Sequence, residues 1–307
     1  MAERRAVVIV SGGGAISPFT TPDIVAGSGF TAGCTDTALR EHLLAAGHYT
    51  FTSPATVGHG QAERDPGFGG FDDMPVVLPS EMTVNSVGDI DTAGQHLARF
   101  LEFLHAEYGV DTFDMVGHSM GGLFSRAAYR VLKDVQSPLR YRSLTTIGTP
   151  WQGAFIGDYS VGDISLDDAG DSAFTRAAMI EGKKFKESET EGAGDQVTHR
   201  YLMGANGWNA RQAGVLDGVP VTLLVGDYFA EASGDPRIWP HDGIVSATSA
   251  SAIDVSAEVL PIRSLYRFPD VHSIFVSDLA EIPLERALTW DPDALAVVAD
   301  AIANAEA

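Results

Sequence analysis

The sequence predicts an α/β fold in which helices cover both faces of a mostly parallel sheet. Apolar segments of strand length alternate along the chain with amphipathic segments of helix length. Residues 6–10 form an unbroken, mainly β-branched run, which is typical of a strand buried on both faces of a parallel sheet. Residues 90–108 carry apolar side chains at helical spacing and lead into a second strand-like run at 113–116.

The other elements follow from the same two periodicities. Residues 36–46 place Leu39, Leu43 and Leu44 on one helical face, and Gly47 follows as a stop signal. Asp291 and Pro292 form an N-cap and first-turn pair that opens a last helix, predicted to reach about residue 302. Further strands are predicted at 49–52, 143–147, 219–225 and 265–268, the last of them as a core strand.

Two segments lack this alternation. Residues 54–81 are rich in Gly, Pro and Asp, and a loop of that length inside a compact domain is usually functional or mobile. We therefore expect it to border the site. Residues 154–217 contain a helix-like piece at about 171–186 but no strand pattern. We predict one domain that spans residues 1–307.

Composition excludes several classes of function. A chain of 307 residues that is 45% hydrophobic can bury a large core. The formal net charge of -21 repels phosphate backbones and anionic membrane surfaces, so nucleic acid is not an expected partner. No apolar run reaches the roughly 20 residues of a transmembrane helix.

Cys34 is the only cysteine, which excludes an intrachain disulfide and a cysteine-based metal cluster. The many Asp residues could hold Ca²⁺, but no loop shows regular ligand spacing, so no metal ion or other cofactor is predicted. The apolar run at 6–10 is too short for a signal-peptide core. We expect a cytoplasmic protein, or a secreted one whose leader has been removed.

The strand at 113–116 runs into the pentad Gly117-His118-Ser119-Met120-Gly121, which opens directly into a helical pattern. A turn this tight strains the central residue and requires neighbours with almost no side chain. It lifts the Ser119 hydroxyl clear of the sheet and leaves the Met120 amide at a helix N-terminus, facing a developing oxyanion. A chain with 33 glycines could produce the pentad by chance, but the strand and helix around it indicate a nucleophile elbow.

With this elbow the chain resembles the α/β-hydrolase family of serine esterases and lipases. Three other motifs add to the resemblance: SGGGA at 11–15, GTPWQG at 148–153, and DGIVS at 242–246 with VHS at 271–273. The resemblance implies an α/β-hydrolase fold with a short core like that of minimal bacterial lipases. It also implies that residues 154–217 form a lid or cap insertion over the site.

The resemblance places the second oxyanion amide in the loop after the first strand. Ser11 stands where the family commonly has histidine, but a backbone donor needs no particular side chain. By position, the oxyanion hole would be formed by the amides of Gly13 and Met120, with Gly14 as the substitute for Gly13. The alternative is a simple turn after a strand.

A serine nucleophile needs a base, and the base needs an acid to hold its tautomer. The family order is serine, then acid, then histidine. Three histidines follow the elbow and its helix, at 199, 241 and 272, and only His272 follows the last predicted strand. The resemblance therefore implies His272 as the base.

Two aspartates after the strand at 219–225 could be the acid. Asp227 is nearer the strand end, whereas Asp242 begins a turn that resembles the acid-bearing turn of many lipases. Gly243 would allow a tight turn, and the apolar pair that follows would anchor it in the core. Asp242 is therefore the expected acid and Asp227 the alternative.

Together these residues predict a serine hydrolase of carboxylic esters, a carboxylesterase or lipase, with a small-molecule ester or lipid as substrate and an acyl-enzyme formed on Ser119. A thioesterase, lactonase or amidase would use the same groups. A non-catalytic binding protein on this fold is a further alternative, but such proteins usually lose a member of the triad, and fold alone does not establish activity.

Overall fold

The computed structural model describes residues 4–23, 35–63, 76–188, 192–231 and 234–305, and the backbone of 29–30 and 68–69. A six-stranded sheet lies at its centre, in the order β10-β9-β8-β7-β1-β3, and all five neighbouring pairs are parallel. Its strands are β1 (Arg5–Val10), β3 (Thr50–Thr52), β7 (Thr112–His118), β8 (Arg140–Ile147), β9 (Val221–Gly226) and β10 (Arg263–Phe268). The predicted parallel α/β sheet is confirmed. Cys34 lies outside the described residues.

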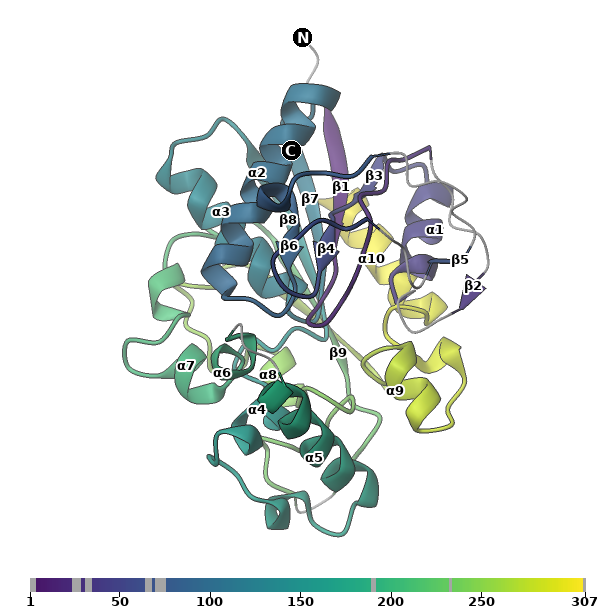
Figure 1. Ribbon diagram of the computed structural model, residues 1–307, viewed down its shortest axis with the longest axis vertical. Helices are drawn as coiled ribbons and strands as arrows, with labels where there is room; N and C mark the ends of the chain where they lie inside the picture. Colours follow the sequence, from purple (N-terminus) through teal and green to yellow (C-terminus); the bar gives the residue numbers. More distant parts are fainter. Residues whose placement is uncertain are drawn as a thin grey trace.

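Helices cover both faces of the sheet (Figure 1). On one face lie α2 (Ile90–Tyr108) and α3 (Gly121–Asp134), and on the other α1 (Thr37–Ala45) and α10 (Pro292–Asn304). In β1, Val8 belongs to the core cluster that contains α2 and α3, whereas Val7 and Ile9 belong to the cluster with α1 and α10. Both faces of this strand are buried, which explains its unbroken apolar sequence.

The ends of α2 follow from single residues. The Asp89 side chain accepts a hydrogen bond from the Thr92 amide and caps the N-terminus. Gly109, in the left-handed region with φ 68°, ends the helix. In α10 the Asp291 side chain accepts from the amides of Asp293 and Ala294, and Pro292 occupies the first turn.

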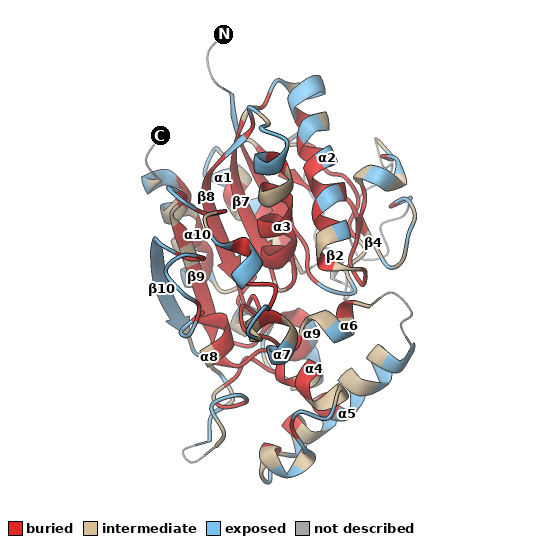
Figure 2. Ribbon diagram, turned by 90° about the vertical axis from the view of Figure 1, so that its left-hand side faces the viewer, coloured by how far each residue is buried: buried red, intermediate tan, exposed pale blue. Residues whose placement is uncertain are grey.

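The last strand corrects one prediction. Residues 265–268 were expected to form a core strand, but β10 is the edge of the sheet. Leu265 and Tyr266 are 45% and 44% exposed, and the strand is exposed along most of its length (Figure 2). The apolar pattern identified a strand correctly but does not reveal whether a helix covers its faces.

In its described part, the segment at 154–217 consists of helices joined by turns and contains no strand. It contains α4 (Phe155–Ser160), α5 (Ala173–Ser188), α6 (Ala193–Gln196) and α7 (His199–Met203), with 3-10 turns at Leu166–Ala169 and Ala210–Gln212. These helices gather beyond the carboxyl ends of the central strands (Figure 1). Crossovers of the parallel sheet therefore leave this segment next to the strand ends where ligands of α/β sheets bind.

The remaining elements are short. β2 (Gly29–Phe30) pairs antiparallel with β5 (Phe68–Gly69), and β4 (Ala55–Thr56) pairs parallel with β6 (Val84–Asn85). Helices α8 (Ala247–Ala250) and α9 (Ile274–Leu279) and the 3-10 turns Ser80–Met82 and Leu284–Arg286 complete the described chain. Within that part of the chain, none of the helices combines the length and the apolar character that crossing a bilayer requires.

Candidate active site

Ser119 sits between the end of β7 and the start of α3 with φ 53°, in the left-handed region that non-glycine residues rarely adopt. Two of the hydrogen bonds that hold this strained backbone come from β8 and the turn after it. The Ser119 amide donates to the Ile147 carbonyl at 2.8 Å, and Thr149 Oγ1 donates to the Ser119 carbonyl at 2.8 Å. The end of β8 and the Gly-Thr-Pro turn that follows it therefore stabilise the elbow.

The two glycines of the pentad allow backbone segments to meet. A Cβ on Gly121 would lie 2.0 Å from the Val10 carbonyl oxygen, and one on Gly117 would lie 2.5 Å from the Gly122 nitrogen. Neither position can hold a side chain without moving the backbone. These glycines bring the end of β1 and the start of α3 against the elbow, which sets the location of the glycine loop that follows β1.

That glycine loop passes directly over Ser119. A Cβ on Gly12 would lie 2.5 Å from Ser119 Cβ, and one on Gly13 would lie 2.8 Å from Met120 Sδ. In the described part of the chain, the amides of Gly13 and Met120 have no hydrogen-bond acceptor, whereas the Gly14 amide donates to the Ser86 carbonyl at 3.4 Å. Gly13 is thus better placed than Gly14 to donate to a ligand beside Met120. The close approach at Gly12 was missed by sequence reasoning, although three consecutive glycines were a visible signal.

Ser11 anchors the same loop from below. Its hydroxyl donates to Asp36 Oδ2 at 2.5 Å and lies 2.8 Å from the Ser17 hydroxyl. Asp36 is buried just before α1, and burial raises the pKa of its carboxyl to about 6 in spite of the Ser11 hydrogen bond. A serine at this position therefore ties the glycine loop to α1.

His272 and Asp242 are joined twice. His272 Nδ1 lies 2.7 Å from Asp242 Oδ2, and the His272 amide donates to the Asp242 carbonyl at 2.8 Å. Asp242 Oδ1 accepts from the amides of Ile244 at 3.0 Å and Val245 at 2.8 Å. A carboxylate held in this way requires a proton on Nδ1, which leaves Nε2 of the imidazole as an acceptor.

Asp227 lies in a different environment. Its Oδ2 is 3.9 Å from Arg267 Nη1, and the side chain is partly exposed. Among the described residues Asp227 makes no hydrogen bond to His272. Of the two aspartates left open by the sequence, the structure brings Asp242 against His272. Gly243, with φ 109°, supplies the left-handed residue of the turn that does so.

Two further residues contact this pair, and sequence reasoning gave neither of them a role. A Cβ on Gly148 would lie 2.9 Å from His272 Nδ1 and 3.1 Å from Asp242 Oδ2, so the Gly-Thr-Pro turn packs directly on the pair. His118 Nε2 donates to the His272 carbonyl at 3.0 Å. Burial lowers the pKa of His118 to about 3, which keeps this ring neutral and able to donate.

Helix α5 reaches both sides of the site. Near one end, Thr175 Oγ1 lies 3.0 Å from Nε2 of His241, the residue before Asp242. Burial lowers the pKa of His241 to about 4, and its Nδ1 accepts from the Gly243 amide at 2.9 Å. Near the other end, a Cβ on Gly14 would lie 3.6 Å from Phe185 Cζ. The helix therefore extends from the turn that bears the acid to the glycine loop.

Within the described ranges, no group of three or more His, Cys, Asp or Glu side chains is arranged to hold a metal ion.

Part of the chain is similar in sequence to a known protein family and to curated proteins. Residues 73–207 match the family described as "Alpha/beta hydrolase of unknown function (DUF915)". Triacylglycerol lipases of Pseudarthrobacter phenanthrenivorans and Burkholderia plantarii are each 32% identical over 87 residues, or 28% of this chain. The match spans only 26% and 23% of the length of these two relatives.

Solved structures match over nearly the whole chain at low identity. The mature lipase BlEst2 of Bacillus licheniformis has a TM-score of 0.52 at 13% identity, over 92% of this chain and 90% of its own. A thermostable carboxyl esterase of Bacillus coagulans has a TM-score of 0.54 at 12% identity, over 99% of this chain and 91% of its own. At such identities the likeness establishes the arrangement of elements.

Proposed function

Because this chain has the α/β-hydrolase fold, we propose that it is a serine hydrolase of carboxylic esters, a carboxylesterase or lipase. One observation carries the proposal. His272 and Asp242 form a buried pair 2.7 Å apart, and the Gly-Thr-Pro turn that packs on this pair also donates a hydrogen bond to the strained Ser119 backbone. The lipase and esterase names of the relatives support an ester substrate.

In the proposed reaction, Ser119 Oγ attacks the acyl carbonyl carbon while His272 Nε2 accepts the hydroxyl proton. The amides of Gly13 and Met120 donate to the oxyanion of the tetrahedral intermediate. The ester C–O bond then breaks, and His272 returns the proton to the departing alcohol. A water molecule, deprotonated by His272, then attacks the acyl-enzyme in the same way, which releases the carboxylic acid and restores the Ser119 hydroxyl. Asp242 keeps the imidazole oriented and stabilises its charged form in both halves.

We also propose that residues 154–217 act as the lid of this site. The contacts of α5 with His241 and with the Gly14 region support this role, because they place one helix against both the acid-bearing turn and the glycine loop. The modest apolar content of the segment favours soluble esters over lipid droplets as substrates.

The test is a panel of p-nitrophenyl esters of increasing acyl length, with a thioester of matched acyl group, combined with an organophosphonate probe and intact-mass measurement. We expect ester turnover and one covalent adduct on the native protein, and neither on Ser119→Ala. Heat-denatured protein serves as the control for non-specific labelling. Absence of turnover on every ester, with no adduct on the native protein, would contradict the proposal.

A further inference from the structure

His118 is the last residue of β7 and directly precedes Ser119, but the proposed reaction gives its side chain no part. The residue is buried, with 6% of its surface exposed. Burying a polar ring costs free energy unless its nitrogens make hydrogen bonds, so an imidazole at this position calls for a physical reason. The contacts that the structure describes for this ring lead to His272.

The His118 side chain joins the nucleophile elbow to the loop that carries His272. Its Nε2 donates to the His272 carbonyl at 3.0 Å, and the centroids of the two rings lie 4.8 Å apart with the planes tilted by 45°. In the described part of the chain, this is the only hydrogen bond between residues 117–121 and residues 270–274. The serine and the proposed base are therefore linked through one side chain.

The hydrogen bonds of His272 divide into two kinds. Its Nδ1 lies 2.7 Å from Asp242 Oδ2, and its amide donates to the Asp242 carbonyl at 2.8 Å. These two bonds fix His272 to the acid, but they do not fix the distance of the pair from Ser119. The bond from His118 holds the carbonyl of His272 and comes from the residue next to the serine. It is therefore the bond that relates the base to the nucleophile.

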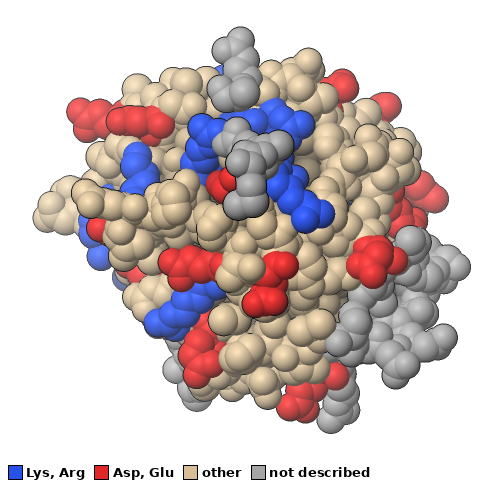
Figure 3. Space-filling view, turned by 90° about the horizontal axis from the view of Figure 1, so that it is seen from above, with Lys and Arg blue, Asp and Glu red and all other residues tan. Residues whose placement is uncertain are grey.

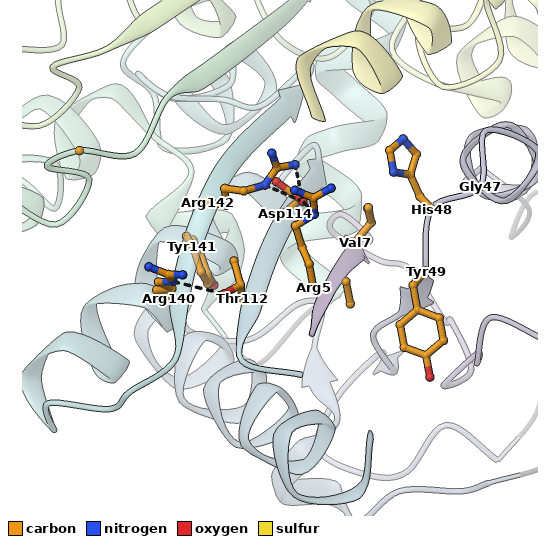
Figure 4. Close-up of a pocket in the computed structure, with 12 residues that line it drawn as sticks. Arg5, Val7, Gly47, His48, Tyr49, Thr112, Asp114, Arg140, Tyr141 and Arg142 are labelled. Atoms are coloured by element: carbon orange, nitrogen blue, oxygen red, sulfur yellow. Dashed lines mark hydrogen bonds and ion pairs between the residues drawn. The ribbon is translucent and has the colours of Figure 1, made fainter. Parts of the chain in front are cut away.

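A residue that positions another must itself be held, and β8 holds β7 at both ends. Asp114, earlier on β7, accepts from the Arg142 guanidinium of β8 at 2.8 Å (Figure 4). Directly after His118, the Ser119 amide donates to the Ile147 carbonyl at the end of β8. The backbone of His118 is thus fixed on both sides along the chain.

The His118 ring is a neutral donor. Burial and then the neighbouring His272 lower the pKa of His118 to about 3. A neutral ring with its proton on Nε2 donates to the carbonyl throughout the pH range in which a histidine base works. Exposed Arg and Lys side chains gather at the other end of the sheet (Figure 3), roughly 20 Å away along β7, which is too far to reverse this shift.

We propose that His118 is a positioning residue: its N–H group holds the His272 carbonyl and so keeps Nε2 of His272 within reach of Ser119 Oγ. This role rests on the proposed function, in which His272 is the base. Because a misplacement of about 1 Å can cost about 100-fold in rate, loss of the N–H group should act on kcat and leave KM nearly unchanged.

The test compares His118→Gln with His118→Met. The two substituted side chains are similar in length and volume, but only that of Gln keeps an N–H group that can reach the His272 carbonyl. With a p-nitrophenyl ester as substrate, kcat of His118→Met should fall about 100-fold, with KM within about twofold of the native value. His118→Gln should keep kcat within about fivefold of the native value.

His96→Met is the matched control. His96, on α2, is also buried, with 8% of its surface exposed, and its Nδ1 lies 2.9 Å from the Thr83 carbonyl. This substitution removes the same kind of hydrogen bond away from the site, so it should lower the thermal midpoint about as much as His118→Met does and leave kcat unchanged. If His118→Met does not fold, His118→Asn takes its place, because the shorter amide does not reach the carbonyl.

A second readout needs no substrate. The Nδ1 proton of His272, in its hydrogen bond to Asp242, can be followed by NMR. Its exchange with water should be about tenfold faster in His118→Met than in His118→Gln, because the loop opens more often once its carbonyl is released.

Equal kcat in His118→Gln and His118→Met, or a change confined to KM, would overturn the positioning role. A native protein that hydrolyses none of the esters would contradict the proposed function instead. The proton exchange rates would then decide the role of His118, and equal rates in the two variants would overturn it.

Discussion

Two buried carboxylates near opposite ends of the sheet are stabilised in opposite ways. Asp114, within β7, accepts from the Arg142 guanidinium and from Ser143 Oγ at 2.6 Å. Asp242, beyond β9, accepts from two backbone amides and lies against His272. The Arg142 guanidinium neutralises the charge of Asp114, and this ion pair links β7 to β8. Neutral dipoles leave the charge of Asp242 free to stabilise a proton on the imidazole.

Asp270 extends the comparison to a buried carboxyl that has one arginine beside it but accepts no hydrogen bond in the described part of the chain. It is buried two residues before His272, and neither of its oxygens has a hydrogen bond among the described residues. Arg286 Nε lies 3.2 Å from Oδ1, but burial and the neighbouring Asp291 raise the pKa of Asp270 to about 7. The number and kind of hydrogen-bond donors therefore decide the role of each buried carboxyl. It can stabilise the fold as an ion pair, orient a histidine as a carboxylate, or remain protonated.

The largest expected effect is at Asp242. Asp242→Asn should keep the fold and substrate binding but lower kcat about 10⁴-fold, because the amide stabilises the wrong imidazole tautomer. Asp227→Asn, the control, should lower kcat less than about tenfold, since Asp227 pairs with Arg267. Steady-state kinetics on both variants makes the comparison, and the reverse ranking would move the acid to Asp227.

The second effect is on stability. Asp114→Asn should lower the free energy of unfolding by about 3–5 kcal/mol, because it leaves the buried Arg142 guanidinium without its counter-charge. We expect kcat of the folded variant to remain near the native value. Urea denaturation of Asp114→Asn and of Asp114→Asn/Arg142→Met checks this, and the double variant should recover much of the loss. A loss below about 1 kcal/mol in the single variant would contradict the assignment of Asp114 to folding.

A third prediction separates backbone strain from placement of the His–Asp pair. Gly148→Ala puts a methyl group 2.9 Å from His272 Nδ1 and should lower kcat about 100-fold by displacing the ring. Gly109→Ala pays a similar left-handed backbone cost, with φ 68° and nothing within 4 Å, and should leave kcat unchanged. Gly109→Ala should lose about 1 kcal/mol of stability, and Gly148→Ala should lose about 1–3 kcal/mol more because its methyl group meets buried side chains. Equal kcat in the two would show that Gly148 does not position the pair.

The smallest effect is a pH dependence at Asp270. Its pKa is raised on folding, so its contribution to stability is complete below about pH 4 and is lost as the pH rises to about 7. Asp270→Asn should therefore be more stable than the native chain by about 1–3 kcal/mol above pH 7, with the difference shrinking toward pH 4. Denaturation curves at four or five pH values measure this. A difference independent of pH would mean that Asp270 is ionised throughout.

Local patterns predicted most of the fold. The predicted strand at 6–10 and the predicted helix at 90–108 agree with the bounds of β1 and α2. Burial on both faces of a strand and capping of a helix each depend on a few neighbouring residues, so a local pattern can predict them. The strand at 265–268 is where the sequence predicts it, but the prediction that it is buried is wrong, because coverage by helices is a property of the assembled sheet. The 54–81 loop lies partly outside the described residues, so its relation to the site stays a prediction.

Motif spacing and periodicity are local properties of a sequence, and they predicted the main strands and helices, the turn at Ser119 and a short set of candidate partners. The contact of Asp242 with His272, which is 30 residues away, and the absence of such a contact for Asp227 depend on how the chain packs in three dimensions. The contacts of Gly148 with that pair and the alignment of Arg5 with Arg140 across β7 likewise depend on strand register. Strand register and packing bring together residues that are distant in sequence, and such contacts cannot be predicted from the pattern within a single segment.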